Sequence, residues 1–531
     1  MGDIEMATSV VNLDALIQRN DFRVKSESTT DYSRRDKISI TDLDPKAFMY
    51  LALRKPDFQR ETANWSPQKI YDFVKTFLEG DLVPAIILWA AGETVFVIDG
   101  AHRLSALIAW VQDDYGDGPT SREFSKNDIP VEQQKAAKRT KRLIDETIGS
   151  YREHVLAGEN PEGARPEVLQ RARRLASLSL DLQWIRNTDA QKAESSFFKI
   201  NQAATPIDPT ELRIIRARKS ANAIASRIIT RNSTGYEYWS EFPDKKKEIE
   251  EIGRETYRLL FHPPLETPIK TLDLPVAGRG YSSPTLPLVF ELVNLANGVP
   301  VVDLTRKSTK AEEKFTPDID GTETLAFLKN TRRIVNQITG LHPSSLGLHP
   351  AVYFYSATGR HQPTAFLAVI EMVKEMEQRS LFRKFTEARR KFEEFILDNK
   401  SFSNQVTVKF GSGAKGFVKL KNLYMQIFDL LRDGKSNQEV LSALAASSDF
   451  SFLTPGVPIA ESAGAGFSKS VKSATFLKDA ISGAPRCKIC GCLLHYNSIH
   501  VDHIVRKQDG GLGVASNAQL AHPYCNSTYK N

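Results

Sequence analysis

The sequence predicts a multidomain α+β protein, in which a mixed α/β domain is followed by a mainly helical middle and a small metal-stapled C-terminal module. Three observations lead to this prediction. The chain has 531 residues, more than one hydrophobic core usually organises, so two to four domains are expected. Outside the terminal module, strand-like apolar runs occur before residue 185, whereas helical periodicity dominates from about 190 to 400. All four cysteines lie in the last 45 residues.

The composition is that of an ordinary globular protein, with 41% hydrophobic and 25% charged residues. No apolar run reaches the ~20 residues needed to span a bilayer, and the N-terminus does not resemble a secretory signal, so we expect a cytoplasmic protein. The net charge of +7 is concentrated, because residues 401–531 carry 14 basic and 8 acidic side chains. This excess suits a polyanionic partner, although solvated surface lysines give the same balance.

The first 34 residues are interpreted as a leader, and residues 35–215 as the mixed α/β domain. Ser66 and Pro67 form a good helix start, because serine caps free backbone N–H groups and proline fits the first helical position. A helical stripe of apolar side chains follows and ends near Gly80. We therefore expect a helix between these points.

Short apolar runs flanked by turn residues predict the strands of this domain. Gly100 ends one of these runs and precedes a helical pattern, so a strand–turn–helix unit is expected there. The predicted strands are residues 85–89, 95–98 and 180–184, and the predicted helix is residues 101–111.

Residues 216–400 are predicted to form a mainly helical middle domain. Residues 401–483 are interpreted as a basic helical segment followed by a linker. Within them, Ser451–Ser482 is rich in Gly, Ala, Ser and Pro, which predicts little structure of its own. This linker separates the terminal module, residues 484–531, from the rest of the chain.

The terminal module contains two pairs of metal-ligating residues with knuckle spacing, Cys487-x-x-Cys490 and His522-x-x-Cys525. Three thiolates and one imidazole form a donor set that Zn²⁺ binds as a tetrahedron. A module of this size buries little apolar surface, so a structural zinc ion would supply folding free energy. Cys492 and His495 are rival ligands, and four reduced, unligated cysteines are the alternative interpretation.

Between these pairs lies a group suited to phosphodiester hydrolysis, which needs an activated water and a cation on the scissile phosphate. The stretch from His500 to His503 alternates like a strand, so Asp502 and His503 face opposite sides. His503 is suited to deprotonate water near neutral pH, and Asp502 offers Mg²⁺ an oxygen ligand. Asn526 offers a second oxygen from a helix that returns beside the strand.

Gly510 and Gly511 mark a turn, and Asn517 is placed to tie down the loop backbone. The order D-H, G-G, N and C-N-x-x-x-K, set among the metal knuckles, resembles the HNH endonuclease family, which has the ββα-metal fold. This resemblance covers about 45 residues. The sequence departs from the family at His522, where many relatives carry a cysteine, and at Arg506, where proline is common.

The resemblance implies a role for each polar residue of the module. It implies that His503 is the general base and that Asp502 and Asn526 bind the catalytic cation, Mg²⁺ or Mn²⁺. Asn517 corresponds to the middle asparagine of the family. The knuckle residues then hold a structural Zn²⁺.

A second motif, Asp99-Gly100-Ala101-His102-Arg103, follows the predicted strand at 95–98. A glycine turn at a helix N-terminus favours anion binding, and an arginine can fork onto a phosphate. The alternative is a surface turn in which Arg103 pairs with a carboxylate, or in which Asp99 caps the helix.

The wider N-terminal pattern contains F-Q-R, W-S, G-D-L-V-P-A-I-I-L and V-I-D-G-A-H-R-L, and later F-K-I-N, T-P and E-L. It resembles the ParB/sulfiredoxin-related N-terminal domain of GmrSD-type and SspE-type restriction proteins over roughly residues 40–215. That resemblance implies binding and hydrolysis of a nucleoside triphosphate and sensing of modified phage DNA. The family's usual D-G-Q-Q-R motif is D-G-A-H-R in this sequence. The loss of both glutamines affects the expected hydrolysis of the nucleotide more than the expected binding of its phosphates. The phosphate-site residues it implies are Arg60, Asp99, Gly100, His102 and Arg103, with Asn201 as a weaker candidate.

Together these features predict a metal-dependent DNA endonuclease of a restriction or anti-phage type, whose N-terminal domain binds NTP or senses modified DNA and controls cleavage. The expected ligands are catalytic Mg²⁺ or Mn²⁺, structural Zn²⁺ and an NTP. DNA is the expected partner, no membrane is expected, and oligomerisation is left open. The alternatives are a ParB-like DNA-binding regulator with an inactive zinc knuckle and a nuclease that acts on RNA.

Overall fold

The computed structural model describes residues 10–22, 35–186, 189–203, 208–300, 315–456 and 466–530. The chain divides into two compact units. The first unit contains the described residues up to Arg218 and two short segments that return to it, Thr234–Tyr238 and Tyr281–Pro284. The second unit contains the other described residues, including the predicted nuclease module.

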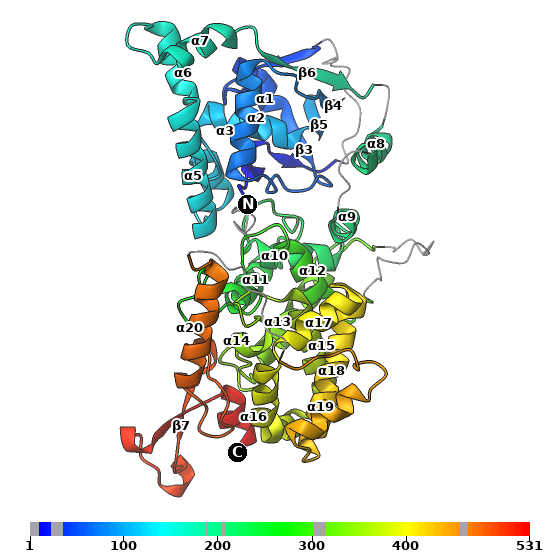
Figure 1. Cartoon of the computed structure of the whole chain (residues 1–531). Coiled ribbons are helices and arrows are strands. Elements are labelled where there is room, and N and C mark those ends of the chain that lie inside the picture. The colour runs from blue at the N-terminus through cyan, green and yellow to red at the C-terminus, as the bar shows by residue number, and fades with distance from the viewer. Residues whose placement is uncertain are drawn as a thin grey trace. The chain divides into compact units, whose positions relative to one another are not determined.

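A mixed sheet, six-stranded within the described residues, organises the first unit (Figure 1). The strand order is β1-β3-β5-β4-β6-β2, in which β4 and β5 form an antiparallel hairpin and β2 pairs antiparallel with β6. The remaining neighbours pair in parallel. The strands are β1 (Arg19–Asn20), β2 (Lys37–Ser39), β3 (Leu53–Pro56), β4 (Ile86–Ala91), β5 (Thr94–Asp99) and β6 (Ser179–Trp184).

Alternate side chains of the central strand β5 enter two separate cores. Val95 and Val97 pack on one face with residues of helices α2 and α3, whereas Phe96 and Ile98 pack on the other face with Phe197 of α8. Because side chains pack against both faces of β5, its sequence is a continuous apolar run rather than an alternating one. The helices are α1 (Phe48–Ala52), α2 (Pro67–Glu79), α3 (Ala101–Gln112), α4 (Pro119–Phe124), α5 (Val131–Thr147), α6 (Tyr151–Glu159), α7 (Pro166–Leu175), α8 (Ala190–Ala203) and α9 (Pro209–Arg216).

The local predictions for this unit are confirmed. The hydroxyl of Ser66 accepts a hydrogen bond from the backbone nitrogen of Lys69 at 3.2 Å, which caps α2 at its predicted start. The helix ends at Gly80, whose φ of +79° is the left-handed conformation that glycine adopts without strain. The three predicted strands are β4, β5 and β6, and the helix after Gly100 is α3.

Residues 10–22, expected as part of a leader, are instead built into the first unit. Val11, Leu13 and Leu16 are buried in the core that α2 and α3 line. The apolar residues of this stretch therefore serve packing. The rest of the predicted leader, residues 1–9 and 23–34, lies outside the described residues.

A buried ion-pair network anchors this N-terminal segment. The carboxylate of Asp14 lies 2.6 Å from Lys55 Nζ and 3.0 Å from Arg19 Nη2, and none of the three residues is more than 8% exposed. Burial alone would raise the pKa of Asp14, but the charges of Arg19 and Lys55 hold it well below its usual range. Arg19 also donates hydrogen bonds to the carbonyl groups of Pro56 and Gln59, so the network fixes the F-Q-R stretch.

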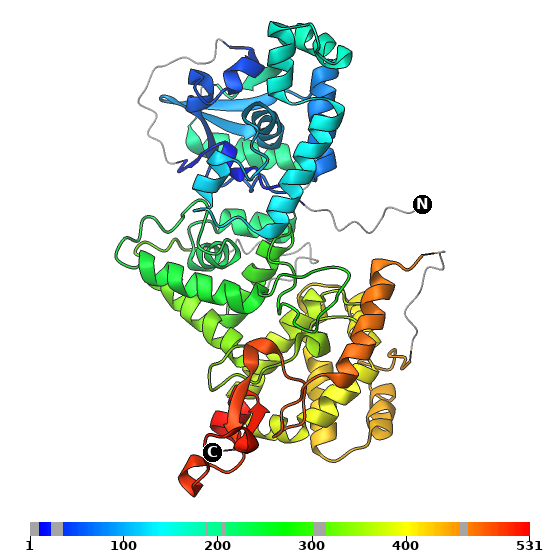
Figure 2. The same cartoon turned by 90° about the vertical axis from the view of Figure 1, so that its left-hand side faces the viewer.

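Packed helices form most of the second unit, and the mainly helical middle is confirmed (Figures 1 and 2). Helix α11 packs on α13, α10 on α12, and α18 on both α15 and α16. The helices are α10 (Ala221–Thr230), α11 (Lys246–Phe261), α12 (Thr285–Ala296), α13 (Thr322–Ile338), α14 (Pro350–Tyr353), α15 (Pro363–Gln378), α16 (Phe382–Asp398), α17 (Ser401–Phe410), α18 (Ala414–Arg432), α19 (Asn437–Ala445) and α20 (Lys469–Gly483). Among the described helices, none combines the length and apolar composition that a bilayer-spanning segment requires.

The predicted lack of structure in Ser451–Ser482 is wrong for its second half, where α20 forms. The hydroxyl of Ser473 accepts a hydrogen bond from the backbone nitrogen of Ile269 at 3.0 Å, and Leu477 is buried. Helix α20 therefore packs against the helical unit. The small residues of its sequence misled the prediction, because alanine and serine also occur in helices that pack closely. Residues 457–465 of the predicted linker lie outside the described residues.

Replacing Asp14 with Asn tests whether the N-terminal segment belongs to the first unit. The substitution leaves two buried cations without their counter-charge, so we expect it to lower the free energy of unfolding by about 3–5 kcal/mol. Chemical denaturation of the full chain measures this. Asp36→Asn, at an exposed carboxylate of the same unit, is the control and should change stability by less than about 0.5 kcal/mol. Equal effects of the two substitutions would contradict the structural role of Asp14.

Candidate metal centre and nuclease site

A short antiparallel hairpin carries two of the predicted catalytic residues, Asp502 and His503. Strand β7 (His500–His503) pairs with β8 (Ala518–Ala521), which places Asp502 opposite Gln519. A π-helical turn, Cys525–Tyr529, closes the chain, with the backbone nitrogen of Lys530 donating to the carbonyl oxygen of Cys525 at 3.1 Å. The hairpin lies at the edge of the second unit, away from most of its helices (Figures 1 and 2).

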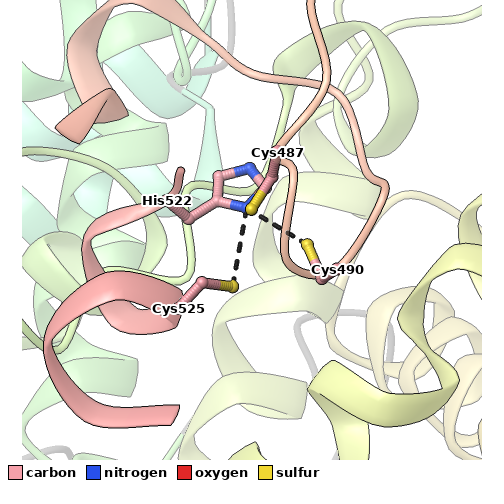
Figure 3. Close-up of side chains that lie close together, drawn as sticks. All are labelled: Cys487, Cys490, His522 and Cys525. Carbon is pink, nitrogen blue, oxygen red and sulfur yellow. Dashed lines mark hydrogen bonds between the residues drawn. The ribbon is translucent and has the colours of Figure 1, made fainter. Parts of the chain in front are cut away.

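The predicted zinc ligands converge in one group, as Figure 3 shows. The ligand atoms of Cys487, Cys490, His522 and Cys525 all lie within 4.8 Å of one another. Nδ1 of His522 is 3.3 Å from the sulfur of Cys490 and 3.9 Å from that of Cys525. Its other ring nitrogen, Nε2, lies 3.0 Å from the carbonyl oxygen of Leu493, which fixes the ring and turns Nδ1 toward the thiols.

This donor set fits Zn²⁺, which takes thiolate and imidazole ligands in a tetrahedron. The residues are largely buried, and the small apolar cluster around them contains Leu494 and Ala521. Hydrogen bonds among the clustered thiols, that of Cys487 first, hold the pKa of Cys490 well below its usual value and raise the pKa of Cys525 well above it. The group therefore supports zinc binding, and a bound ion would replace the large core that this module lacks.

Cys492 and His495, the rival ligands, do not belong to the group found among the described residues. The sulfur of Cys492 lies 3.7 Å from the carbonyl oxygen of Cys490. The ring of His495 packs edge-on against His349, with the ring centroids 5.6 Å apart. Burial lowers the pKa of His495 to about 4, so its imidazole is neutral at physiological pH.

The helical part of the second unit supports the metal-binding group from outside. Gly347 adopts a φ of +59° and packs so closely on His522 that an added Cβ would lie 2.5 Å from its ring. Buried Arg389 donates to the carbonyl oxygen of Gly347 and forms an ion pair with Glu393 at 2.6 Å. Three further hydrogen bonds join the terminal module to the helical part of the second unit. They connect Gly340 N with Ser498 Oγ, Tyr524 N with Ser345 O, and His500 Nε2 with Leu341 O.

Asp502 is the buried member of β7, with only 5% of its surface exposed. Its Oδ2 atom accepts a hydrogen bond from Gln519 Nε2 at 2.7 Å. The same oxygen forms an ion pair with Lys530 Nζ at 2.8 Å. The preceding residue, Val501, is 65% exposed on the opposite face. The alternation predicted for this strand is therefore confirmed.

Asn526 reaches the same face of the hairpin as Asp502. Its side-chain nitrogen lies 3.4 Å from Nδ1 of His500, which precedes Asp502 by two residues on β7. A carboxylate and an amide oxygen are both ligand types that Mg²⁺ accepts. The imidazole of His503 is partly exposed and forms no hydrogen bond to the described residues, whereas its carbonyl oxygen accepts one from Lys530.

The loop between the strands is fixed by Asn517, as predicted. Its Oδ1 atom accepts a hydrogen bond from the backbone nitrogen of Val505 at 2.7 Å, and its Nδ2 atom donates to the carbonyl oxygens of Val505 and Leu512. Only glycine fits at position 511 of this loop, because an added Cβ would lie 1.8 Å from the carbonyl oxygen of Val505. Asn517 thus acts on the backbone rather than on the predicted cation.

In the first unit, Gly100 begins α3 in the left-handed conformation, with a φ of +96°. An added Cβ would lie 2.5 Å from Ile86, so only glycine fits this turn. The guanidinium of Arg103 contacts Asp99 at 2.6 Å and the carbonyl oxygen of Ala85 at 3.1 Å. The structure thus contains the carboxylate pairing considered as the alternative, and Asp99 does not cap the helix.

His102 stacks on Trp65, with the ring centroids 5.7 Å apart. Burial, together with the positive charges of Arg60 and Lys55, lowers the pKa of His102 to about 3. The imidazole is therefore neutral at physiological pH and offers a hydrogen bond rather than a charge. Burial raises the pKa of Glu211, and the charge of Arg60 opposes that rise, which places Arg60 near both groups.

Several buried polar atoms around this turn lack a hydrogen-bond partner among the described residues: Gln59 Oε1, His102 Nε2 and Arg103 Nε. Native proteins rarely leave such atoms unpaired, so their grouping is typical of a site for a polar ligand. Gln59 is tied to the motif, because its Nε2 atom lies 3.4 Å from the carbonyl oxygen of Ile98. The side chain of Asn201, the weaker candidate, lies outside the described residues.

Sequence reasoning missed two polar residues at the hairpin, Gln519 and Lys530. The strand register would have identified Gln519, because it lies opposite Asp502. The terminal lysine was visible in the C-N-x-x-x-K ending, but only the π-helical turn explains how it returns to β7.

One chain thus joins a mixed α/β unit to a hairpin that is flanked by a Cys3His metal-binding group. Residues 43–217 match the family model of the GmrSD restriction endonuclease N-terminal domain, and residues 487–531 match that of the HNH endonuclease. These two matches are those of a GmrSD-type fusion of a restriction-endonuclease N-terminal domain with an HNH module, and they support a restriction-type nuclease, as the sequence predicted. No curated protein and no solved structure matches the chain.

The zinc assignment is tested by comparing two cysteine substitutions. We expect the wild-type protein to retain about one zinc ion per chain, because the four converging ligands complete a tetrahedron. Cys490→Ser should remove most of this zinc and lower the melting temperature, whereas Cys492→Ser should retain the zinc. Metal analysis after dialysis measures both. Retention of zinc by Cys490→Ser together with its loss from Cys492→Ser would contradict the proposed ligand set.

Proposed function

We propose that this protein is a metal-dependent DNA endonuclease of a restriction or anti-phage type. The observation that carries the proposal is a hairpin beside a Cys3His metal-binding group, where Asn526 of the π-helical turn lies on the face of the hairpin that carries Asp502, within a segment that matches the HNH endonuclease model. The basic C-terminal region suits a polyanionic substrate. The N-terminal match to a restriction-endonuclease domain favours DNA over RNA as that substrate.

In the proposed reaction, His503 accepts a proton from the attacking water. Its partly exposed imidazole suits this role, because no hydrogen bond to the described residues occupies its ring nitrogens. Asp502 and Asn526 bind a divalent cation, Mg²⁺ or Mn²⁺, which when bound stabilises negative charge on the scissile phosphate. Asn517 keeps the loop after His503 in one conformation through its three backbone hydrogen bonds.

The first unit is proposed to bind a nucleoside triphosphate or to sense modified DNA, and thereby to control cleavage. The support for this site is the left-handed glycine turn at Gly100 and the unpartnered polar atoms of Gln59, His102 and Arg103. Arg60 supplies a positive charge beside His102. Asp99 contacts only Nη2 of Arg103, so the unpartnered Nε of the same guanidinium is the donor that remains for a phosphate.

The second candidate is a ParB-like DNA-binding regulator whose zinc knuckle is catalytically inactive. The ion pair between Lys530 and Asp502 is the observation in its favour, because it occupies one oxygen of the proposed metal ligand. Such a protein would bind DNA in the presence of Mg²⁺ without cutting it. Cleavage assays therefore separate the two candidates.

Replacing His503 with Ala tests the nuclease proposal. Loss of the general base should reduce the rate of DNA cleavage in Mg²⁺ by about 10²- to 10⁴-fold. His342→Ala, at an exposed histidine of the same unit, should cut at the wild-type rate. If the wild-type protein binds DNA but neither it nor the control cuts in Mg²⁺ or Mn²⁺, the regulator is the better description.

Control by the first unit is tested by measuring cleavage of modified and unmodified DNA with and without each NTP. We expect the nucleotide to change the cleavage rate of the wild-type protein. Gly100→Ala should abolish this response, because the added Cβ collides with Ile86 and disturbs the turn. Basal cleavage by the hairpin should continue in that variant. Identical wild-type rates with and without every NTP would exclude nucleotide control.

A further inference from the structure

We propose that Lys530 is a positioning residue of the nuclease, which together with Gln519 holds one oxygen of Asp502 and presents the other to the catalytic cation. The inference rests on the proposed role of Asp502 as a metal ligand. It adds two residues to the site and assigns a task to the terminal π-helical turn.

The contacts of Asp502 are unevenly divided between its two oxygens. Gln519 Nε2 and Lys530 Nζ both contact Oδ2, at 2.7 and 2.8 Å, and the carboxylate forms no hydrogen bond through Oδ1 within the described residues. The side chain of Asp502 is 6% exposed and that of Lys530 is 18% exposed, so the pair is shielded from water. Two donors on one oxygen fix the carboxylate plane and leave the lone pairs of Oδ1 for a cation.

Lys530 is itself held from three directions. Its Nζ atom also donates to the carbonyl oxygen of His503, and its own carbonyl oxygen accepts a hydrogen bond from Arg506. Its backbone nitrogen donates to the carbonyl oxygen of Cys525, one of the four residues of the metal-binding group. The lysine therefore links the zinc ligands to the strand that carries both Asp502 and the proposed general base.

The π-helical turn explains how this link is made. Hydrogen bonds from residue i+5 to residue i widen the turn and occur often at functional sites. Here the wider turn runs from Cys525 to Lys530 and brings the ammonium group back to β7. Asn526 lies in the same turn, and its side-chain nitrogen lies 3.4 Å from Nδ1 of His500. One turn thus places both a proposed metal ligand and the residue that orients the other ligand.

A different role for the same ammonium group predicts the opposite result. If Lys530 only neutralised Asp502, it would compete with the cation and repel it, so removing it would strengthen metal binding. If Lys530 positions the carboxylate, removing it should weaken metal binding. Loss of a residue that orients a metal ligand typically costs about 10- to 100-fold in metal affinity or activity.

The test measures Mn²⁺ binding to the zinc-loaded full-length protein by electron paramagnetic resonance, without DNA. The variants are Lys530→Met, Asp502→Ala as the reference for loss of the site, and Lys507→Met as a matched control at an exposed lysine of the same module. We expect Lys530→Met to raise the dissociation constant of Mn²⁺ by about 10- to 100-fold. Lys507→Met should bind as the wild type does. Unchanged or tighter binding by Lys530→Met would overturn the inference.

The reference variant separates this inference from the proposed function. If Asp502→Ala binds Mn²⁺ as well as the wild type, the proposed metal site itself is wrong. If Asp502→Ala loses binding but Lys530→Met does not, only the role of Lys530 is wrong. Zinc content and melting temperature identify any variant that fails to fold. Should Lys530→Met fail to fold, Gln519→Leu decides, because it removes a donor to the same oxygen without changing charge, and its unchanged Mn²⁺ affinity would overturn the inference.

Discussion

The convergence of three thiols and one imidazole is the constraint on which the nuclease module depends. The two knuckles are separated by the whole hairpin in sequence, yet their ligand atoms lie within 4.8 Å of one another. The apolar cluster around them is too small to order the module alone. Bound zinc would therefore fix the ends of the hairpin and the start of the π-helical turn together. Everything proposed for Asp502, Asn526 and Lys530 follows from that arrangement.

The terminal module packs against the helices of the second unit, and this packing fixes its position within that unit. Gly347 packs against His522, and Arg389 holds the backbone of Gly347 while it pairs with Glu393. Helix α20, which leads into the module, packs through Ser473 and Leu477. The nuclease residues are therefore positioned by packing against helices as well as by metal ligands. Any control exerted by the first unit acts on a hairpin that is already ordered within the second.

The sequence predicted the parts of the site that are local. The cap at Ser66, the turn at Gly100 and the zinc knuckles each depend on a few neighbouring residues whose chemistry is specific. The sequence did not reveal contacts made across long separations. The burial of Asp14 with Lys55 depends on how distant strands meet, and the packing of α20 depends on the surface that receives it. The contact between Lys530 and Asp502 likewise depends on the π-helical turn, which no sequence pattern predicted.

We propose that the terminal module binds two different metals, a structural Zn²⁺ and a catalytic divalent cation. Anomalous diffraction from crystals of the full chain grown with Zn²⁺ and Mn²⁺ tests this most directly. The account predicts a zinc peak among Cys487, Cys490, His522 and Cys525, and a separate manganese peak beside Oδ1 of Asp502 and the side-chain oxygen of Asn526. A zinc peak alone, with Lys530 still on Asp502 and no manganese nearby at saturating concentration, would contradict it.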